Sequence, residues 1–465
     1  MKSITIIIFL MVSVVHIFAQ GVGIGTNTPA PSAILEVKSN SQGLLISRLT
    51  TSQRKAIVSP AVGLLVYDLD KNTLYMFDGF SWLPFATMGA SSANPVVVPA
   101  PAGANFLGGD VAISGYYAVI GAPDEDKDGN PKGKGAVYIF KKINSSWVFM
   151  TRLTAFDRAY GDEFGAVVEM DNDRVVVGVP KKTTNNVFES GAIYIYRRVG
   201  ETWNHETKLY ANDPGAGDHF GTSVAIDGNL VLAGAPNDDI DAIGDNKGSV
   251  YGFVLTNFIW AFNQKITAQG ALSDERMGES ISLSGSWLIS GANHKVYFYV
   301  WLYGGWVYKQ TFTNPLPNTP GFAFFGFSVS VSGNVAVVGN ASHDKDLTQL
   351  DAGAAHVYEL SAGLWTLKAN LIPEETMGGD FFGYSVSVSN NIIVCSAPRR
   401  EVNSVLNAGK VFIYQKNGAN WELTQKSVSP DASTQYCRFT DISGFDMVLA
   451  AYNPVANAIY FLNIQ

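Results

Sequence analysis

Residues 217–236 read GDHFGTSVAIDGNLVLAGAP, and residues 161–180 read GDEFGAVVEMDNDRVVVGVP. Both stretches carry a glycine after an aromatic residue and a small residue 13 positions later, at the end of a β-rich run. The same pair marks seven units along the chain, spaced by 55 to 57 residues in five of six cases and by 48 residues for the fourth unit. Such self-similarity is typical of a repeat architecture. The pairs are Gly108 and Gly121, Gly165 and Gly178, Gly221 and Gly234, Gly278 and Gly291, Gly326 and Gly339, Gly383 and Ser396, and a decayed Arg438 and Ala451.

Each unit contains four candidate strands. In the third unit, Ser223–Ile226 and Leu230–Ala235 flank an Asp-Gly-Asn turn, and Ser249–Val254 and Trp260–Ile266 follow a polar loop. Alternating apolar residues with turns of this kind predict antiparallel hairpins. Units of about 50 residues with four strands are typical of propeller blades, which bury their faces only against neighbouring blades. We therefore expect an all-β fold: a seven-bladed β-propeller of four-stranded antiparallel blades, preceded by a small β-rich N-terminal module.

A tryptophan recurs at the start of the fourth strand of six units. It could stack on a ligand, but its recurrence at one repeat position favours packing between blades. The six residues are Trp147, Trp203, Trp260, Trp306, Trp365 and Trp421.

The two ends of the repeat region indicate how the ring closes. The seventh unit ends after its third strand, Ala458–Asn463, so its fourth strand is missing. The repeat spacing places a strand near Ala93–Pro99, where Val96-Val97-Val98 supplies it. Pairing of this segment with the last blade would remove two exposed sheet edges. An alternative is Ser81–Ala86, whose Trp82 resembles the repeat tryptophan.

The repeat dipeptides and tripeptides carry a family resemblance. Phe164-Gly165, Phe220-Gly221, Gly121-Ala122-Pro123 and Gly234-Ala235-Pro236 resemble FG-GAP repeats over roughly residues 100–465. Those repeats build the propeller of integrin α chains and of many bacterial surface proteins. The resemblance implies a binding or adhesion module.

The first 20 residues read as a secretory signal peptide. Lys2 precedes the apolar stretch Ile4–Val15, and small and polar residues follow at positions 19–21. The alternative is a membrane anchor, but the stretch is short of the about 20 apolar residues that a bilayer span needs. No later segment is long and apolar enough to span a membrane. We therefore expect a secreted or outer-surface protein with no transmembrane segment after signal cleavage.

Residues 21–88 belong to no propeller unit and contain regular strand-like runs. Gly23-Ile24-Gly25-Thr26, Arg48-Leu49-Thr50 and Asp78-Gly79-Phe80-Ser81-Trp82 resemble the N-terminal module of exported Bacteroidetes surface and fibre-like proteins. The alternative is an irregular linker. Residues 89–95 read as a hinge, and residues 96–465 form the predicted propeller.

Composition narrows the classes of partner and cofactor. The net charge of −8 and the lack of a basic run argue against nucleic acid, which requires a basic patch. Cys395 and Cys437 are the only cysteines, too few for a disulfide framework. A buried free thiol is the expected state of both, and one bridge between them is the alternative.

One acidic motif raises the question of calcium. Asp124, Asp126 and Asp128 alternate before Gly129, and such carboxylates can wrap Ca²⁺ in oxygen atoms. Two features count against the site: the loop lacks the closing glutamate of an EF-hand, and integrin-type repeats carry their calcium loop before the Gly-Ala-Pro element. The alternative interpretation is a plain acidic turn. Calcium is the only cofactor that the sequence suggests.

We expect the partner to bind at the long loops that join strands two and three, which emerge on one face together with the connections between blades. Solvated loops kept polar for solubility are the alternative. The expected partner is an extracellular protein or glycan. The loops are residues 124–134, 181–190, 237–247, 341–352 and 399–408.

Recognisable catalytic motifs are missing, so we expect that the protein is not an enzyme. Pairs such as Asp162-Glu163 could serve acid–base chemistry, but the position recurs as Asp218 and Asp380, which favours a turn-forming role. Two alternatives remain open: a glycan-acting enzyme with its site at the propeller mouth, and a structural component of a surface fibre or envelope complex.

Overall fold

The fold is described from a computed structural model of the 465-residue chain, which divides into two compact units, residues 1–89 and 90–465. The structure describes residues 22–26, 28, 34–41, 43–71, 73–77, 82–84, 95–101, 104, 107–126, 133–144, 146–241, 244–316, 324–402, 404–429, 436–451 and 458–464. The predicted signal peptide therefore lies outside the described residues, as does almost all of the predicted hinge.

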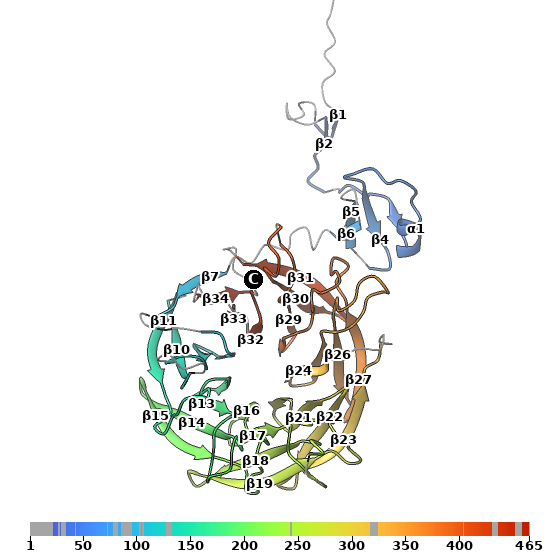
Figure 1. Ribbon diagram of the computed structural model, residues 1–465. Coiled ribbons are helices and arrows are strands. Elements are labelled where there is room, and N and C mark those ends of the chain that lie inside the picture. Colours follow the sequence, from blue (N-terminus) through green and yellow to red (C-terminus); the bar gives the residue numbers. More distant parts are fainter. Residues whose placement is uncertain are drawn as a thin grey trace, which may run out of the picture. The chain divides into compact units, whose positions relative to one another are not determined.

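The described part of the second unit forms seven four-stranded antiparallel sheets arranged in a ring (Figure 1). The first strand of each sheet contacts the first strand of the next, and the last of these, β32, contacts the first, β8. The all-β propeller fold with four-stranded blades is confirmed.

The strands of blades 1 to 3 follow one another in chain order. Blade 1 consists of β8 (Val111–Ser114), β9 (Tyr117–Ala122), β10 (Ala136–Ile143) and β11 (Ser146–Leu153). Blade 2 consists of β12 (Val167–Asp171), β13 (Arg174–Val179), β14 (Ala192–Val199) and β15 (Thr202–Leu209), and blade 3 of β16 (Ser223–Asp227), β17 (Leu230–Ala235), β18 (Ser249–Thr256) and β19 (Ile259–Thr267).

Blades 4 to 6 follow the same meander. They are β20 (Ser280–Ser284), β21 (Trp287–Ala292), β22 (Lys295–Leu302) and β23 (Gly305–Thr313); β24 (Phe325–Ser332), β25 (Val335–Asn340), β26 (Ala354–Ser361) and β27 (Leu364–Leu371); and β28 (Val386–Ser389), β29 (Ile392–Ala397), β30 (Lys410–Asn417) and β31 (Asn420–Val428).

Blade 7 joins the two ends of the repeat region. It consists of β32 (Phe439–Ser443), β33 (Asp446–Ala450), β34 (Ala458–Asn463) and the early strand β7 (Val96–Pro99). Strand β7 pairs antiparallel with β34, with Val98 opposite Ile459 and Val97 opposite Tyr460. The predicted closure by the Val96–Val98 segment is confirmed (Figure 1). The alternative segment lies elsewhere, because Trp82 belongs to the N-terminal sheet.

The recurring glycines are explained by contacts within and between blades. The N–H of Gly108 donates to the carbonyl oxygen of Gly121 in the same unit at 2.8 Å. A Cβ atom added to Gly121 would lie only 2.0 Å from the carbonyl oxygen of Gly165 in the next blade. Gly178 stands in the same relation to Gly221, at 2.2 Å. Neighbouring blades therefore approach too closely at this point for any side chain.

The seventh unit departs from the expected pairing of Arg438 with Ala451. The N–H of Arg438 donates to Ala450, not to Ala451, and Cys437 has the left-handed backbone conformation, with φ of 63°, that Gly165 has in the second unit. The equivalent pair is therefore Cys437 and Ala450, one residue earlier than expected. Without a glycine to mark it, the position could not be fixed from the sequence. Cys437 and Cys395 are both buried and free, as expected.

The repeat tryptophans pack between blades, as predicted. Trp147 stacks on Phe461 of blade 7, with ring centroids 4.4 Å apart and an interplanar angle of 11°. Trp203 meets Tyr117 of blade 1 edge-on at 5.9 Å. All six tryptophans are buried, so each covers the face of the preceding sheet instead of standing free for a ligand.

The first unit contains two small sheets. Strands β1 (Val22–Ile24) and β2 (Leu35–Val37) form a parallel pair. Strands β3 (Arg48–Leu49), β4 (Leu65–Asp68), β5 (Thr73–Phe77) and β6 (Trp82–Pro84) form a four-stranded sheet beside helix α1 (Thr51–Lys55). Its core holds a buried ion pair between Arg54 and Asp68 at 2.8 Å, and the Arg54 guanidinium lies 3.7 Å from the Tyr75 ring centroid. Within the described residues, no helix has the length and apolarity to cross a membrane.

Candidate functional site

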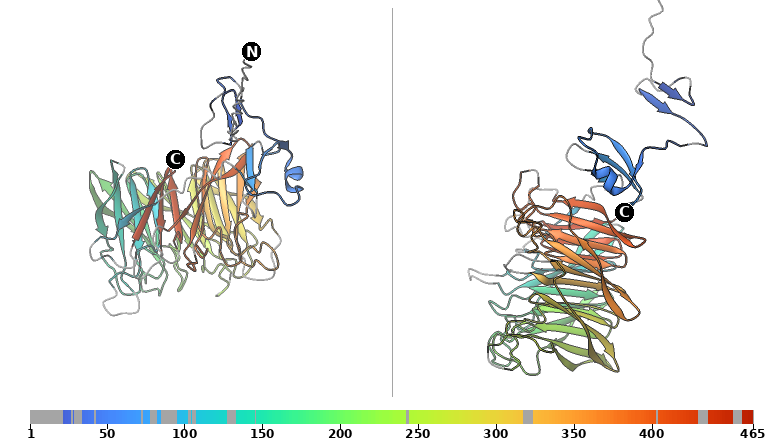
Figure 2. Two further views of the ribbon diagram at one scale, coloured as in Figure 1. Left: turned by 90° about the horizontal axis from the view of Figure 1, so that it is seen from above. Right: turned by 90° about the vertical axis from the view of Figure 1, so that its right-hand side faces the viewer.

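The ring has two faces with different connections. The loops that join strands two and three, and those that join one blade to the next, emerge on one side, which we call the loop face. The short hairpin turns between strands one and two, and between three and four, emerge on the other side, which we call the turn face. Seen from the side, the longer connections gather along one edge of the ring (Figure 2).

Buried tyrosines anchor the loop face in blades 1 to 4. Each lies at the same position of the third strand and donates its hydroxyl hydrogen to a carboxylate in a loop. A lysine or arginine binds the same carboxylate in each case, and in three of the four blades it comes from the fourth strand. The four sets are Tyr138, Glu125 and Arg152; Tyr194, Asp157 and Lys208; Tyr251, Asp213 and Lys265; and Tyr297, Glu275 and Lys295.

Blade 3 shows the arrangement in detail. Lys265 Nζ lies 2.8 Å from Asp213 and 2.7 Å from Asp238, which is buried. Tyr251 and Ser249 donate to these carboxylates as well. Burial raises the pKa of Asp238, and Lys265 opposes that shift. The two loops of this blade are therefore tied to one cation.

The recurring carboxylate of the connections between blades forms turns, as predicted. Asp162 accepts the backbone N–H of Ala159 at 2.6 Å, and Asp218 and Asp380 accept the N–H three residues before them in the same way. Glu275 does so in the fourth connection, at 3.2 Å. Burial raises the pKa of Asp218 to about 6. These carboxylates hold the loops in shape and are not an isolated acid–base pair.

Large apolar side chains are exposed on the loops of the loop face. Phe188 is 65 % exposed, although the buried ion pair of Lys182 and Asp162 holds its loop from below, and Leu347 is 83 % exposed. Exposed apolar groups on ordered loops are a feature of surfaces that bind partners. The set comprises Phe156, Tyr160, Phe188, Tyr210, Leu272, Leu347, Leu350, Met377 and Leu406.

The expected calcium ligands divide between described and undescribed residues. Asp128 lies outside the described residues. The carboxylate of Asp126 forms ion pairs with Arg152 and Arg158. These arginines lower the pKa of Asp126 against the effect of burial. A calcium ion would have to displace them, and no group of three or more His, Cys, Asp or Glu side chains in the described part of the chain could hold a metal. Calcium at Asp124, Asp126 and Asp128 stays a prediction.

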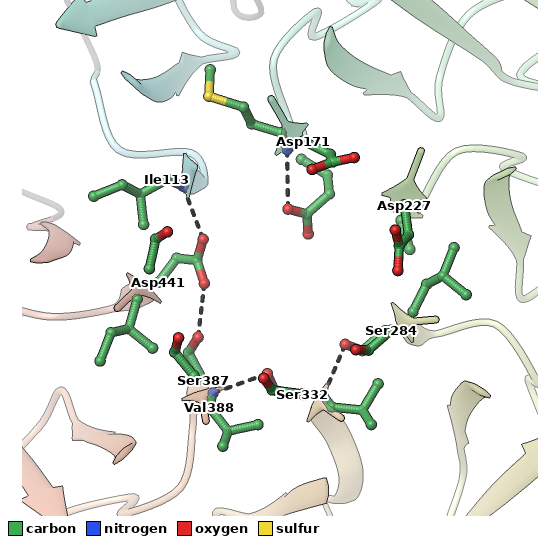
Figure 3. Close-up of a pocket in the computed structure, with 18 of the residues that line it drawn as sticks. Ile113, Asp171, Asp227, Ser284, Ser332, Ser387, Val388 and Asp441 are labelled. Carbon is green, nitrogen blue, oxygen red and sulfur yellow. Dashed lines mark hydrogen bonds between the residues drawn. The ribbon is translucent and has the colours of Figure 1, made fainter. Parts of the chain in front are cut away.

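The centre of the ring holds a cavity of about 300 Å³ at the turn-face end. It is lined by the last residues of the first strands of blades 2 to 7 and by Ile113 of blade 1, and Figure 3 shows Asp171, Asp227, Ser284, Ser332 and Asp441 around its open centre. Among the described lining residues there is no Lys, Arg or His. The cavity is therefore polar and acidic.

A continuous ring of hydrogen bonds surrounds the turn-face end of this cavity. The side-chain oxygen of the last residue of each first strand accepts the backbone N–H of the first turn residue in the next blade, at 2.5–3.1 Å. The bond crosses all seven interfaces, including that between blades 7 and 1. The acceptors are Ser114, Asp171, Asp227, Ser284, Ser332, Ser389 and Ser443.

Three carboxylates lie near the seam where the ring closes, and two of them, Glu169 and Asp441, line the cavity, which is the turn-face end of the central channel. Asp441 accepts from Ile113 N–H and from the Ser387 hydroxyl, and Asp110 accepts from Val168 N–H. Burial raises the pKa of Asp110 to about 7 and that of Asp441 to about 6. Burial, and then the negative charge of Asp441, raises the pKa of Glu169 well above its ordinary value. Burial thus shifts the pKa of all three carboxylates upward, as is often seen for functional carboxylates.

Sequence reasoning did not single out these channel residues. Glu169 and Asp441 stand two residues before the turn of their unit, where Ala225, Ser282 and Ser330 stand in other blades. The alternation of the first strand places that position on the channel side. A comparison of the units position by position would have found the two carboxylates as the exceptions.

Family models match most of the described chain. The FG-GAP repeat model matches residues 101–140, 147–196, 203–253, 320–358 and 365–414. A model described as a phage tail like trimerisation region matches residues 23–97. No curated protein matches the chain. FG-GAP repeats indicate a propeller of the binding or adhesion type.

Solved structures provide a propeller-type neighbour. One is a crystal structure provisionally described as a 6-phosphogluconolactonase, from Bacteroides uniformis. It is 12 % identical, has a TM-score of 0.46, and the match covers 77 % of this chain and 92 % of that one.

This neighbour corrects the expectation that the protein is not an enzyme. That expectation relied on missing motifs alone, and a neighbour described as an enzyme shows that it was too strong. The expectation is withdrawn. At this identity and TM-score, however, the likeness assigns no activity to this chain.

The comparisons and the geometry agree on the repeats, the blades and the separate N-terminal region. The chain is therefore an FG-GAP repeat β-propeller protein with a phage-tail-like trimerisation region at its N-terminus.

Proposed function

We propose that the protein is a secreted or surface-attached binding and adhesion protein whose loop face recognises another extracellular macromolecule, a protein in preference to a glycan. The observation that carries this proposal is the set of exposed apolar side chains on the loops of one face. Aromatic residues such as tyrosine are enriched among the residues that supply most of the energy of protein–protein contacts, and aliphatic side chains add apolar surface that binding removes from water. Their spread over many blades suits a broad partner surface.

The anchored loops support the same proposal. Lys182, which is buried, binds Asp162 at 2.8 Å beneath the loop that carries Phe188. Thr184 and Val187 hydrogen-bond to each other across that loop. A loop that is ordered before binding loses less conformational entropy when the partner arrives. The loop face is thus prepared for binding without a large rearrangement.

The location outside the cell is supported by the sequence alone. Lys2 and the apolar stretch Ile4–Val15 form a signal-peptide pattern. N-terminal sequencing of the protein from its native host tests this part. We expect the mature chain to begin near Gly21 and to be found in the medium or on the outer surface. An uncleaved N-terminus in the cytoplasm would contradict it.

We further propose that the N-terminal region joins three chains, so that three propellers act together. A parallel pair of three-residue strands is too small to be stable by itself. Its apolar side chains are exposed, as are others in the same region, and two further copies of the chain would cover them. These residues are Val22, Ile24, Ile34, Leu35, Val37, Leu44, Leu45, Val58 and Val62.

Light scattering on the mature chain tests the assembly. We expect a mass three times that of one chain. The double substitution Ile24→Asp and Val37→Asp places charges on the exposed strands and should shift the mass to one chain without unfolding the propeller. Substitution of the exposed propeller residue Tyr303 by Ser serves as the control and should leave the mass unchanged. A single-chain mass for the unaltered protein would contradict the proposal.

The binding face is tested by capture from the surface proteins of the native environment and by a glycan array. The loop-face variant carries Phe188→Ser, Leu350→Ser and Leu406→Ser, and the turn-face variant carries Phe258→Ser and Tyr303→Ser. All five side chains are exposed, so neither variant should unfold. We expect a specific protein to be captured by the unaltered chain and by the turn-face variant, and to be lost with the loop-face variant.

A further inference from the structure

The central cavity opens on the face opposite the proposed partner surface, and its wall is chemically divided. Asp171 and Asp227, from blades 2 and 3, lie on one side. Ser284, Ser332 and the equivalent serines of blades 6 and 7 complete the circle. Figure 3 shows the two aspartates and these two serines on the same cavity wall. At the rim the wall therefore presents carboxylates on one arc and hydroxyl groups on the other, and a further carboxylate, Asp441, lies on the serine side.

The hydrogen-bond ring fixes what each side chain offers to a ligand. One oxygen of Asp171 accepts from Gly228 N–H and the other from the Asn172 side-chain amide, whereas one oxygen of Asp227 accepts from Gly285 N–H. The remaining lone pairs, above all those of the second Asp227 oxygen, can accept a hydrogen from a ligand. Each serine oxygen accepts a backbone hydrogen bond but keeps its own hydroxyl proton, which it can donate. Acceptors on one arc thus face donors on the other.

This pattern discriminates between classes of small molecule. An anion would meet several carboxylates without any basic side chain in the described lining. A cation could use the carboxylates and the serine oxygens but would leave the hydroxyl protons of the serines without an acceptor. A sugar hydroxyl both donates and accepts, so a polyhydroxylated ring can satisfy both arcs at once.

The size of the cavity and the neighbouring turns suit the same class. At about 300 Å³, it lies at the lower end of the range of ligand pockets, which suits one sugar residue rather than a longer chain. Tyr116 and Phe445 are 70 % and 60 % exposed on the first hairpin turns of blades 1 and 7. These turns follow the first strands of blades 1 and 7, which both contribute lining residues, although neither ring lines the cavity itself.

We infer that the turn-face end of the central channel is a binding site for a neutral, polyhydroxylated small molecule, a single sugar residue, held between the Asp171–Asp227 arc and the serine arc. The site is separate from the loop face and does not depend on the partner proposed there. It needs no cofactor and no chemical step.

Saturation-transfer NMR on the mature protein tests this inference. The probes are glucose, galactose, mannose, fucose and N-acetylglucosamine, with putrescine and inorganic phosphate as charged comparators. We expect at least one sugar to bind the unaltered protein and neither comparator to bind in its place. Putrescine or phosphate binding with the same dependence on cavity residues would overturn the assignment to a neutral ligand. Lack of binding by all five sugars would overturn the site itself.

Two conservative variants locate the binding. Asp227→Asn keeps an oxygen for Gly285 N–H but presents an NH₂ donor to the cavity in place of an acceptor. Ser332→Ala removes one donor of the opposite arc. We expect each to weaken sugar binding about tenfold. Glu201→Gln is the matched control, because Glu201 is exposed on the turn face and lies outside the cavity.

Melting temperatures separate loss of binding from loss of the fold. Asp227→Asn preserves side-chain size, so sugar binding can still be tested with this variant if Ser332→Ala destabilises the hydrogen-bond ring. We expect the Asn variant to melt within a few degrees of the unaltered protein and to lose sugar binding. Unchanged sugar affinity in a folded Asp227→Asn variant would place the sugar elsewhere and overturn the inference.

Discussion

Buried carboxylates are paired with cations on the loop face but not at the turn-face end of the channel. On the loop face, Asp213 and Asp238 share Lys265, and Glu275 is bound by Lys295 and Tyr297. At the channel, Asp441 is held by Ile113 N–H and the Ser387 hydroxyl, and no basic residue lines the described cavity. Paired charges make the loop face rigid, whereas the channel keeps carboxylates that readily hold a proton or a ligand.

The largest effect is expected where pairing on the loop face is broken. Lys265→Met leaves Asp213 and Asp238 without their shared cation, and Asp238 is buried. We expect the free energy of unfolding to fall by about 3 kcal/mol, because an unpaired buried charge is costly. Urea denaturation at neutral pH measures it. Addition of Asp238→Asn should recover part of the loss, and equal stability of the single variant and the unaltered protein would show that pairing is unimportant there.

Removing the charge of a channel carboxylate should instead raise the free energy of unfolding. The pKa of Glu169 is raised above 4.5, and those of Asp110 and Asp441 are raised from 3.8 to about 7 and about 6. Groups with a raised pKa in the folded state contribute stability at low pH and lose it as pH rises through the folded-state value. Stability should therefore decline between about pH 4, the ordinary value of these groups, and about pH 7, the folded-state value of Asp110.

Glu169→Gln isolates the channel from other groups that titrate in this range, such as Asp218 of the loop face. The amide carries no charge, so the variant should be more stable than the unaltered protein at pH 8 by about 1–2 kcal/mol and should match it near about pH 4. Thermal unfolding at the two pH values measures the difference. A variant that is less stable at the higher pH would refute the raised pKa of Glu169.

A smaller effect is expected from a single bond of the turn-face ring. Ser389→Ala removes the acceptor for Gly444 N–H at the interface of blades 6 and 7. We expect a loss of about 1 kcal/mol that does not depend on pH, because a neutral hydrogen bond at a partly exposed site contributes about that much. Denaturant unfolding at two pH values checks both parts. A loss that grows with pH would mean that the serine acts on the channel carboxylates.

The fold could be predicted from the sequence because every unit packs against its neighbour in the same way and so needs the same residues at the same positions. Gly121 and Gly165 meet where no side chain fits, and Trp147 fills the gap between sheets, so both types of residue recur at a fixed period. The closing strand followed from a missing fourth strand. The predicted position of the repeat pair in the seventh unit was wrong by one residue, because Cys437 adopts the left-handed backbone conformation that a glycine adopts in other units.

The sites were less predictable because they depend on contacts between units. The spacing of the aspartates at 124 and 126 suggested a bound cation. Asp126 instead forms ion pairs with Arg152 and Arg158, which come later in the chain. Glu169 and Asp441 are 272 residues apart in sequence and share the channel only because the ring closes. Repetition reveals architecture, whereas function lies in the positions where one unit differs from the others.

The most direct test of the division between the two faces is the affinity of the captured partner for the two surface variants. Biolayer interferometry would compare the unaltered chain with the loop-face variant (Phe188→Ser, Leu350→Ser, Leu406→Ser) and the turn-face variant (Phe258→Ser, Tyr303→Ser). We predict that the loop-face variant loses affinity by about a hundredfold, as expected for the loss of several apolar anchors, and that the turn-face variant is unchanged. Equal affinities of the two variants, or loss with the turn-face variant alone, would contradict the account.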